Sequence, residues 1–299
     1  MHKNQISKVA IQGWQGSFHH FAAGCYYNRP VEVVPCETFH DLFVSLQSGK
    51  VDAAIMAIEN SLAGSIHENF TLMQKFDFKI TGEIYLRIEQ NLMALPGQKL
   101  SDITEVHSHP MALAQCRQFF DKHHHIKLIE SADTALSAKE IADNQIYGRA
   151  TVGGFMAAAL YNLEIMAPSI ESHKSNFTRF LILEKKDVST ETPNKASLWF
   201  TLPHQTGSLS KVLTMIAFHG INLTKIESLP IVGEKWVYEF YIDVIFEDYE
   251  TYQQLISSLQ PFTKRFKILG EYIEGNEHDP QDITNKQAVQ SQLKTEIAC

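Results

Sequence analysis

The sequence predicts an α/β protein built from two units, and three observations lead to this fold class. Up to residue 185, short apolar runs alternate with amphipathic segments, which is the pattern of strands and covering helices in an α/β sheet. Residues 186–195 then contain a single aliphatic side chain, Val188, and read as a linker. Residues 196–274 follow the order βαββαβ, the split ferredoxin-like arrangement.

Hydrophobic periodicity places the elements of the first unit. Residues 39–46 carry apolar side chains at the i, i+3, i+4 and i+7 spacing of a helix packed on a sheet, after a cap at Thr38. The apolar run at 51–58 predicts a strand buried on both faces. Ser65 and Glu68 form a capping box for the next helix. In order, the sequence predicts strands at 9–12, 31–34, 51–58, 83–95, 150–152 and 180–183. Helices are predicted at 17–27, from Thr38, from Ser65, from Pro110, after Ser131 and at 153–160.

The second unit is shorter, and strands and helices are predicted along its whole length. Strands are expected at 197–202, 222–228, 236–246 and 265–273, and helices at 208–219 and 249–259. Residues 275–299 are polar and show no period, which predicts a disordered tail.

Composition excludes several classes of protein. The chain has 299 residues, a length that suits about two domains. Its net charge of -8 argues against a general nucleic-acid-binding protein, and no apolar run is long enough to span a membrane. The four cysteines are scattered without a CxxC motif, as in a reducing cytoplasm. The histidine runs at 19–20 and 123–125 lack metal-ligand spacing, so no metal site is expected.

Two segments that follow predicted strands are candidates for ligand binding. Residues 13–18, Gly-Trp-Gln-Gly-Ser-Phe, can turn sharply and present N–H groups to an anion, or form a plain tight turn. Glu59, Asn60 and Ser61 end the buried strand, at the edge where open α/β sheets bind ligands. These three residue types also suit helix capping and turns, so both interpretations stay open.

Two later segments carry further candidates. Ser108 can cap the helix that begins near Pro110, and Gln115 on that helix can face a cleft. His109 is either a ligand-binding or a structural histidine. The second segment, 176–180, enters the last strand of the first unit. Its arginine can form a bidentate ion pair with a carboxylate or lie at the surface.

The four segments, in this order, resemble the prephenate dehydratase family over roughly residues 8–185. The matching stretches are Gly13-Trp14-Gln15-Gly16-Ser17-Phe18, Ala57-Ile58-Glu59-Asn60-Ser61, Ser108-His109-Pro110 with Ala114-Gln115-Cys116, and Asn176-Phe177-Thr178-Arg179-Phe180. Trp14-Gln15 departs from the family, which commonly has proline and an acidic residue there. The resemblance implies a bilobal, periplasmic-binding-protein-like catalytic domain at 1–185, with one lobe from 7–82 plus 175–185 and the other from 83–174.

The second unit resembles the ACT domain, the amino-acid-sensing module that follows this catalytic domain in the family. The family binds phenylalanine through a Gly-Ala-Leu-Ala turn and a Glu-Ser-Arg-Pro segment. The matching positions here are Gly207, Ser208, Leu209 and Ser210, followed by Glu227, Ser228, Leu229 and Pro230. Because Leu229 stands where the family usually has arginine, feedback control by phenylalanine is expected but its strength is open.

The resemblance implies conversion of prephenate to phenylpyruvate in phenylalanine biosynthesis. Loss of carbon dioxide and the ring hydroxyl makes the ring aromatic, so no cofactor is expected. Thr178 is implied to donate a hydrogen bond to the leaving hydroxyl, because a threonine hydroxyl is too weak an acid to act alone. Ser17 and Arg179 are implied to hold carboxylates. The other implied substrate-binding residues are Glu59, which either acts as an acid or orients its neighbour, and Asn60, Ser61, Ser108, His109, Gln115 and Asn176.

Two alternatives accompany this hypothesis. Arogenate dehydratase acts on the amino-acid analogue of prephenate, and the sequence does not separate the two substrates. A bilobal α/β cleft can also belong to a non-catalytic small-molecule-binding regulator. Because ACT domains commonly pair, a homodimer or homotetramer is expected.

Overall fold

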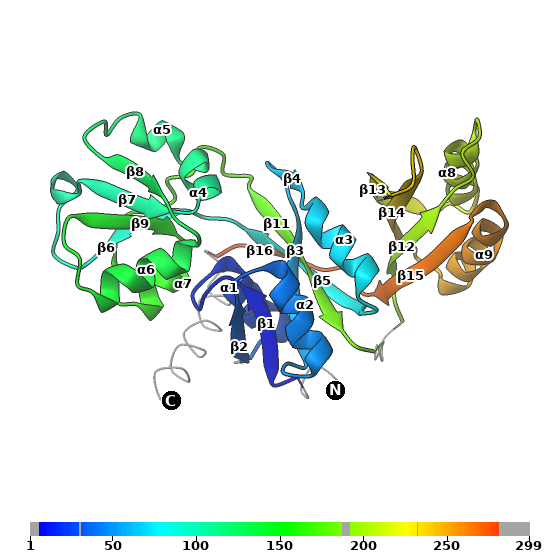
Figure 1. The fold of residues 1–299 in the computed structure, drawn as a ribbon, viewed down its shortest axis with the longest axis horizontal. Coiled ribbons are helices and arrows are strands. Elements are labelled where there is room, and N and C mark those ends of the chain that lie inside the picture. Colours follow the sequence, from blue (N-terminus) through cyan, green and yellow to red (C-terminus); the bar gives the residue numbers. More distant parts are fainter. Residues whose placement is uncertain (1–5, 30, 187–191, 232, 281–299) are drawn as a thin grey trace. The chain divides into compact units, whose positions relative to one another are not determined.

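The computed structural model describes residues 6–29, 31–186, 192–231 and 233–280, and its chain divides into two compact units (Figure 1). One comprises Asp77–Glu83 and Leu181–Gly275, and we call it the ferredoxin-like unit. The other comprises the described residues of 6–76, 84–180 and 276–280, and we call it the bilobal unit. In the described part of the chain, no helix is long and apolar enough to cross a membrane.

The first lobe of the bilobal unit is built around parallel strands. Strands β1 (Lys8–Gln12), β2 (Glu32–Cys36) and β3 (Ala53–Asn60) pair in the order β3-β1-β2 and continue through β11 (Phe177–Glu184) to β5 (Lys79–Arg87). Helices α1 (Phe18–Tyr27), α2 (Phe39–Ser48) and α3 (His67–Lys75) belong to this lobe, and the short β4 (Gly64–Ser65) pairs with β3. The first six residues of β3 are buried, which confirms the strand predicted from its apolar run.

The second lobe contains its own sheet in the order β10-β6-β9-β7-β8. Its strands are β6 (Asn91–Ala94), β7 (Glu105–Ser108), β8 (Lys127–Glu130), β9 (Arg149–Gly153) and β10 (Glu164–Ala167). Alternate residues of β6 enter two different cores: Leu92 packs with α4 (Pro110–Gln115) and α5 (Arg117–Phe120), and Met93 with α6 (Thr134–Asp143) and α7 (Phe155–Leu160). Helices therefore cover both faces. A short 3-10 helix, η2 (Leu100–Asp102), precedes β7.

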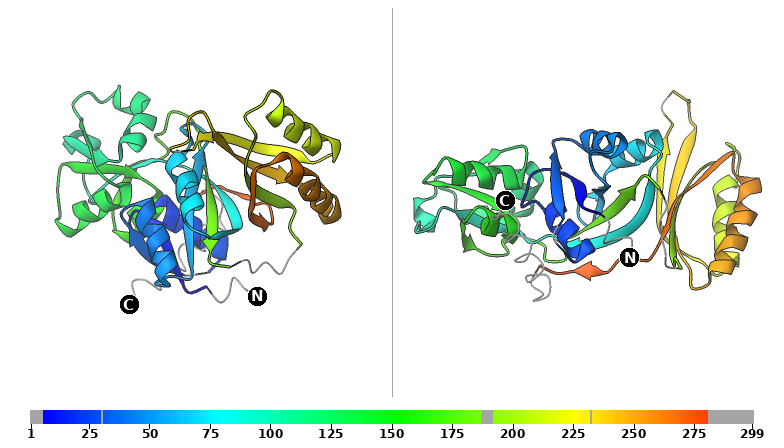
Figure 2. Two further views of the ribbon diagram at one scale, coloured as in Figure 1. Left: turned by 45° about the vertical axis from the view of Figure 1, so that its right-hand side comes forward. Right: turned by 90° about the horizontal axis from the view of Figure 1, so that it is seen from below.

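The ferredoxin-like unit confirms the predicted βαββαβ order. The elements are β12 (Lys195–Thr201), α8 (Ser208–Phe218), β13 (Asn222–Pro230), β14 (Tyr238–Ile245), α9 (Tyr249–Leu259), η3 (Gln260–Phe262) and β15 (Arg265–Tyr272). Its antiparallel sheet has the order β13-β14-β12-β15, and Figure 2 shows α8 and α9 on one face of that sheet. Apolar residues of both helices and of alternate positions in β12 and β14 form the core between them.

Three predictions are corrected by the structure. Ser65 does not cap α3, because it pairs with Glu59 in β4 and the helix starts after Ile66 without a side-chain cap. The expected strand 83–95 is two strands, and β5 extends to Arg87, so the predicted lobe boundary at 82/83 falls inside a strand.

The predicted tail at 275–299 also begins differently. Strand β16 (Glu277–His278) lies parallel to β5, with Glu277 opposite Tyr85. Asp279 then accepts hydrogen bonds from Arg87 at 3.1 and 3.2 Å. Pairing with β5 and the contact between Arg87 and Asp279 thus order a segment whose composition is polar. Residues 281–299 of the predicted tail, and 187–191 of the predicted linker, lie outside the described residues.

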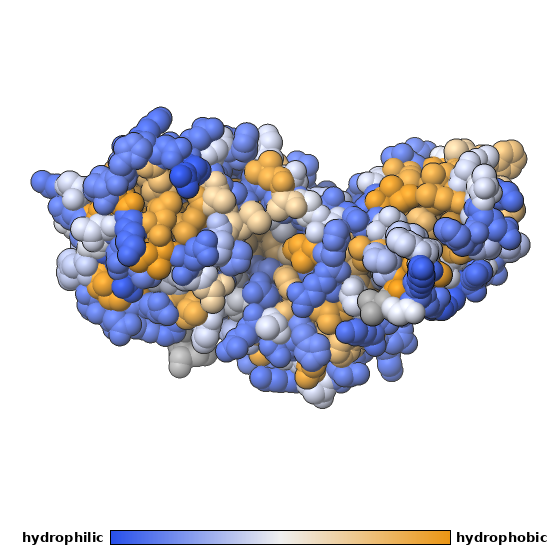
Figure 3. Space-filling model, turned by 45° about the horizontal axis from the view of Figure 1, so that its top comes forward, coloured by the Kyte–Doolittle hydropathy of each residue, from blue (hydrophilic) through white to orange (hydrophobic). Residues whose placement is uncertain are grey.

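Hydrophobic side chains also reach the surface. Figure 3 shows them gathered in patches among hydrophilic residues, including on the second lobe at the left of the view. Exposed large hydrophobic residues of this lobe are Met111, Tyr147 and Ile165. Exposed apolar atoms are normal for a folded protein, so these patches alone do not mark a site.

Candidate active site

Ser61 locks the end of β3 to the beginning of β11. Its N–H donates to the Phe177 carbonyl over 2.8 Å, and its Oγ accepts from the Phe177 N–H over 2.9 Å. The Ser61 hydroxyl also donates to the Ser175 carbonyl over 3.2 Å. The single hydroxyl proton is used in this way, so Ser61 fixes the backbone that leads into Thr178 and has no proton left for a substrate.

Asn60 is held by the turn that follows it. Its Oδ1 accepts from the Leu62 and Ala63 N–H groups at 3.0 and 2.9 Å, and these two donors identify that atom as the oxygen. The Nδ2 group therefore faces β11, where it donates to Asn176 Oδ1 at 2.8 Å and to Thr178 Oγ1 at 3.0 Å. The amide is engaged within the protein, so its expected role changes from binding substrate to orienting Thr178.

The contact with Asn60 decides what the Thr178 hydroxyl can do. Because Oγ1 already accepts from Nδ2, the hydroxyl proton is available for another acceptor. An N–H donor on this oxygen also stabilises the negative charge that grows there when the proton is shared. Thr178 is 8% exposed and Asn176 is fully buried, so the pair is rigidly placed. The arrangement can donate a hydrogen bond to a leaving oxygen atom.

Arg179 does not share this face of the sheet. Successive strand residues point to opposite sides, so Thr178 and Arg179 diverge. On the Thr178 side, Phe180 packs edge-on against His19 of α1, with ring centres 4.9 Å apart. The Arg179 guanidinium carbon lies 5.9 Å from the centre of the Tyr85 ring, and the arginine is buried. The side-chain directions do not support Thr178 and Arg179 acting together on one substrate.

Glu59 also points away from Asn60, for the same geometrical reason. It lies in register with Ser65 of β4 and is partly exposed. Strand alternation therefore separates Glu59 from the Asn60 amide, whose orientation was one of the two roles expected of it.

Three main-chain N–H groups of the loop at residues 13–18 donate to acceptors within the protein. Both glycines have left-handed φ angles, +86° at Gly13 and +88° at Gly16, which other residues rarely adopt. Ser17 caps α1 by accepting from the His20 N–H over 3.4 Å, and its own proton remains available. The acceptors of the loop are the Cys36 carbonyl for Gly13 (2.9 Å), His20 Nδ1 for Gly16 (3.0 Å) and the Trp14 carbonyl for Ser17 (3.0 Å). These three N–H groups are already hydrogen-bonded, so the loop forms a turn and they are not available to bind an anion.

Two of the expected residues in the second lobe have structural functions. Ser108 is fully buried and donates to the Val152 carbonyl over 2.7 Å. It does not cap α4 as predicted, because His109 occupies the capping position and its Nδ1 accepts from the Met111 N–H over 3.2 Å. His109 is exposed, so the other side of its ring can still meet a ligand.

Gln115 is oriented by a residue that the sequence analysis missed. Gln90 Nε2 donates to Gln115 Oε1 over 3.2 Å, so the Gln115 NH2 group is directed elsewhere and can donate. Gln90 is 3% exposed, and its main-chain N–H donates to Glu171 Oε2 over 2.9 Å. A second missed residue is Asp133, the N-cap of α6, whose carboxylate lies against the loop, since a Cβ atom on Gly13 would be 2.5 Å from its Oδ2. Asp133 precedes the apolar pattern of α6, which would identify it as a helix cap. No feature of the sequence predicts its contact with the loop.

The residues expected to bind phenylalanine lie in two segments of the ferredoxin-like unit. Gly207 is the N-cap of α8 with a left-handed φ of +80°, and Ser208, Leu209 and Ser210 form its first turn. Glu227, Ser228, Leu229 and Pro230 end β13, an edge strand of the sheet. Leu229 lies directly opposite Glu239, which is 3% exposed. Burial raises the pKa of Glu239, while hydrogen bonds from Trp199 and Tyr241 act against this rise.

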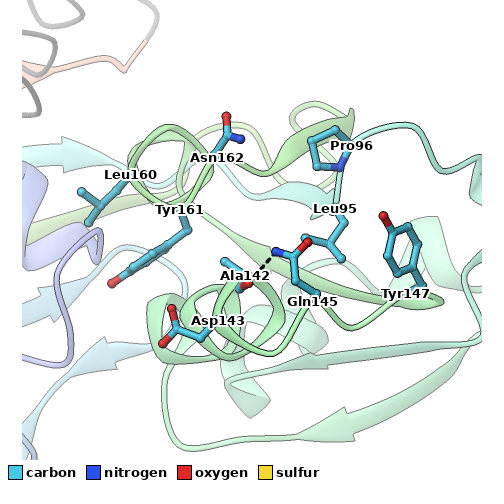
Figure 4. Close-up of a pocket in the computed structure, with 9 residues that line it drawn as sticks. All are labelled: Leu95, Pro96, Ala142, Asp143, Gln145, Tyr147, Leu160, Tyr161 and Asn162. Carbon is cyan, nitrogen blue, oxygen red and sulfur yellow. Dashed lines mark hydrogen bonds between the residues drawn. The ribbon is translucent and has the colours of Figure 1, made fainter. Parts of the chain in front are cut away.

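A separate pocket of about 360 Å³ lies in the second lobe (Figure 4). It is lined by Leu95, Pro96, Ala142, Asp143, Gln145, Tyr147, Leu160, Tyr161 and Asn162. None of the predicted substrate-binding residues lines it, so it is not part of the candidate site.

Comparisons with known proteins identify the relatives of this chain. The family whose description is prephenate dehydratase matches residues 9–188. Arogenate dehydratase 5, chloroplastic, of Arabidopsis thaliana is 36% identical over 297 residues, covering 93% of this chain and 68% of that protein. The bifunctional chorismate mutase/prephenate dehydratase of Aquifex aeolicus is 33% identical over 267 residues, covering 89% and 73%.

Two solved structures have the same fold. A protein described as GqqA, a novel type of quorum quenching acylase, has a TM-score of 0.80 at 29% identity, covering 89% of this chain and 97% of that one. The prephenate dehydratase of Arthrobacter aurescens in complex with L-Phe has a TM-score of 0.79 at 24% identity, covering 98% and 100%. The family match spans more than half of the chain, and this chain belongs to the prephenate dehydratase family.

Proposed function

We propose that this protein converts prephenate to phenylpyruvate, carbon dioxide and water. The main support is the geometry of the Thr178 hydroxyl. Asn60 donates a 3.0 Å hydrogen bond to it, so the hydroxyl proton is available for another acceptor. Family membership supplies the reaction. The ring carboxylate leaves as carbon dioxide, its electron pair becomes a ring double bond, and the ring carbon–oxygen bond breaks to release hydroxide.

Each turnover consumes one proton, because the departing hydroxide becomes water. Thr178 supplies a hydrogen bond to that oxygen as the bond breaks, and the proton is finally drawn from solvent, since a threonine hydroxyl is a weak acid. Ser17 and Gln115 have donors available for the oxygens of the substrate. Arg179 as a carboxylate ligand remains part of the proposal only if the substrate reaches the Tyr85 side of β11.

Incubation with prephenate and, separately, with arogenate tests the function. Phenylpyruvate from prephenate supports the proposal, whereas phenylalanine from arogenate alone favours the second candidate, which the 36% identity to an arogenate dehydratase supports. Turnover of neither substrate contradicts both and leaves a binding protein.

Three variants then test Thr178. Thr178→Val removes the hydroxyl at nearly constant shape and should lower kcat by about 100-fold or more, while Thr178→Ser should retain activity. Thr201→Val, at another buried strand threonine in the ferredoxin-like unit, is the matched control and should leave kcat unchanged. Equal activities of the valine variant at 178 and the wild type would remove Thr178 from the chemistry.

We also infer that an ACT domain at 196–274, within the ferredoxin-like unit, binds phenylalanine through the segments 207–210 and 227–230. The βαββαβ order and the left-handed turn at Gly207 support this. Leu229 offers no charged donor, so we expect weaker binding than in a Leu229→Arg variant, whose guanidinium would lie beside Glu239. Calorimetric titration with phenylalanine measures both proteins, and no heat from either at millimolar ligand contradicts the proposal.

Assembly and location belong to the same proposal. A homodimer or homotetramer is expected from pairing of such units, and light scattering of the full chain gives its mass. A cytoplasmic location stays a prediction from the scattered cysteines, and fractionation of the source cells tests it.

A further inference from the structure

The loop at residues 13–18 belongs to the first lobe but is seated on the second. The Tyr161 hydroxyl donates to the Gln15 carbonyl over 2.8 Å. A Cβ atom on Gly16 would lie 3.0 Å from the Ala157 Cα atom, so the two backbones meet at a distance that only glycine permits. The loop that carries Ser17 is therefore an interface between the lobes.

Asp133 lies at this interface. As the N-cap of α6, its Oδ1 accepts from the Leu136 N–H over 2.8 Å. Its Oδ2 faces the loop, because a Cβ atom on Gly13 would lie 2.5 Å from that oxygen. The Trp14 N–H is near enough to the carboxylate to lower its pKa. One carboxylate thus caps a helix of the second lobe and lies against the loop of the first.

Partial burial strengthens these contacts. It raises the pKa of Asp133, and the N–H donors of Leu136, Ala135 and Trp14, together with the nearby His109, act in the opposite direction. Hydrogen bonds to a poorly solvated carboxylate are strong, and each missing donor is felt more than at an exposed site. A contact of this kind can hold two lobes at a set separation.

We propose that Asp133 is a positioning residue, which holds the Gly13–Trp14 turn, and with it Ser17, against the second lobe in the geometry that binds substrate. This rests on the proposed dehydratase function, in which the loop contributes to substrate binding. Asp133 acts through the loop, and its loss should weaken binding more than it slows the chemical step at Thr178.

Asp133→Asn is the sharpest variant. Its Oδ1 can still cap α6, but an NH2 group then faces the Trp14 N–H, and two donors cannot bond. Asp133→Ser also keeps a capping oxygen, and it cannot reach Trp14. For both, KM for prephenate should rise by about tenfold with a smaller change in kcat, the ratio expected from one lost hydrogen bond to a charged group. Amide hydrogen exchange of a peptide covering 13–18 should accelerate by about tenfold.

Asp248→Asn is the matched control. Asp248 is also an N-cap aspartate, whose Oδ2 accepts from the Thr251 N–H over 2.7 Å, but it caps α9 in the ferredoxin-like unit. This variant should keep the wild-type KM and the wild-type exchange of the loop. A fold defect would lower the active fraction, and hence the apparent kcat, without raising KM.

The outcomes separate the two claims. Unchanged KM and unchanged loop exchange in Asp133→Asn overturn the role of Asp133. If the wild-type protein turns over neither prephenate nor arogenate, the proposed function fails, and the exchange measurement still decides whether Asp133 holds the loop.

Discussion

Replacing Asn60 by aspartate changes one NH2 group into an oxygen at nearly constant volume. In the protein this group donates to Asn176 Oδ1, to Thr178 Oγ1 and to the Phe177 carbonyl, at 2.8, 3.0 and 3.2 Å. In Asn60→Asp the new oxygen can only accept. Asn176 can turn its amide, because its Nδ2 has no hydrogen-bond partner among the described residues. Thr178 then gives its hydroxyl proton to the new oxygen instead of to the substrate.

The expected magnitudes follow from this exchange of partners. The bonds to Asn176 and Thr178 are replaced, and Leu62 and Ala63 still donate to the other oxygen, but the contact with the Phe177 carbonyl is lost, so the free energy of unfolding should fall by about 1 kcal/mol. The catalytic donor is lost, which should lower kcat by about 100-fold or more. Asn60→Ala, by contrast, leaves the buried Asn176 acceptor unsatisfied and should cost about 1–3 kcal/mol.

Urea unfolding followed by circular dichroism measures the stability of both variants, and phenylpyruvate formation measures their turnover. The aspartate variant should be stable and inactive, and the alanine variant both less stable and less active. If Asn60→Asp keeps more than roughly a tenth of the wild-type kcat, the direction assigned to the Thr178 proton is wrong.

Two further predictions concern stability. Burial lowers the pKa of His19 from 6.5 to about 3, and its neutral Nε2 accepts from the Ala57 N–H over 3.3 Å. Between these pH values the unfolded chain binds a proton at His19 and the folded protein does not. The free energy of unfolding should therefore fall by about 1.4 kcal/mol per pH unit as the pH drops from 6.5 toward 3. Unfolding of His19→Gln between these pH values should show a flatter dependence, and an identical slope would contradict the assignment. Lys195 and Glu83 form a buried ion pair at 2.7 Å, so Lys195→Met should lower the free energy of unfolding by about 3–5 kcal/mol. The double variant with Glu83→Gln should recover part of that loss in the same denaturant titration, because no unpaired charge then remains buried.

Local patterns in the sequence predict much of the fold. The apolar run of β3, the cap at Thr38 and the βαββαβ order depend on residues that are close in the chain, so their periodicity can be read directly. Ser65 shows the limit of such local patterns. Its sequence predicts a helix cap, but in the structure Ser65 pairs with Glu59 in a strand. The strand at Glu277–His278 shows it again, since its partner β5 is about 190 residues earlier in the chain.

The sequence by itself determined the family, the order of elements and the segments that carry the candidate site. Only the tertiary structure decided how those segments divide their work. Asn60 turns its NH2 toward Thr178 because two main-chain donors fix its oxygen, while strand alternation sends Arg179 to the other face. Asp133 reaches Trp14 across more than a hundred residues of chain. Hydrogen-bond direction and contacts between distant residues are properties of three-dimensional packing, and neither can be read from spacing along the chain.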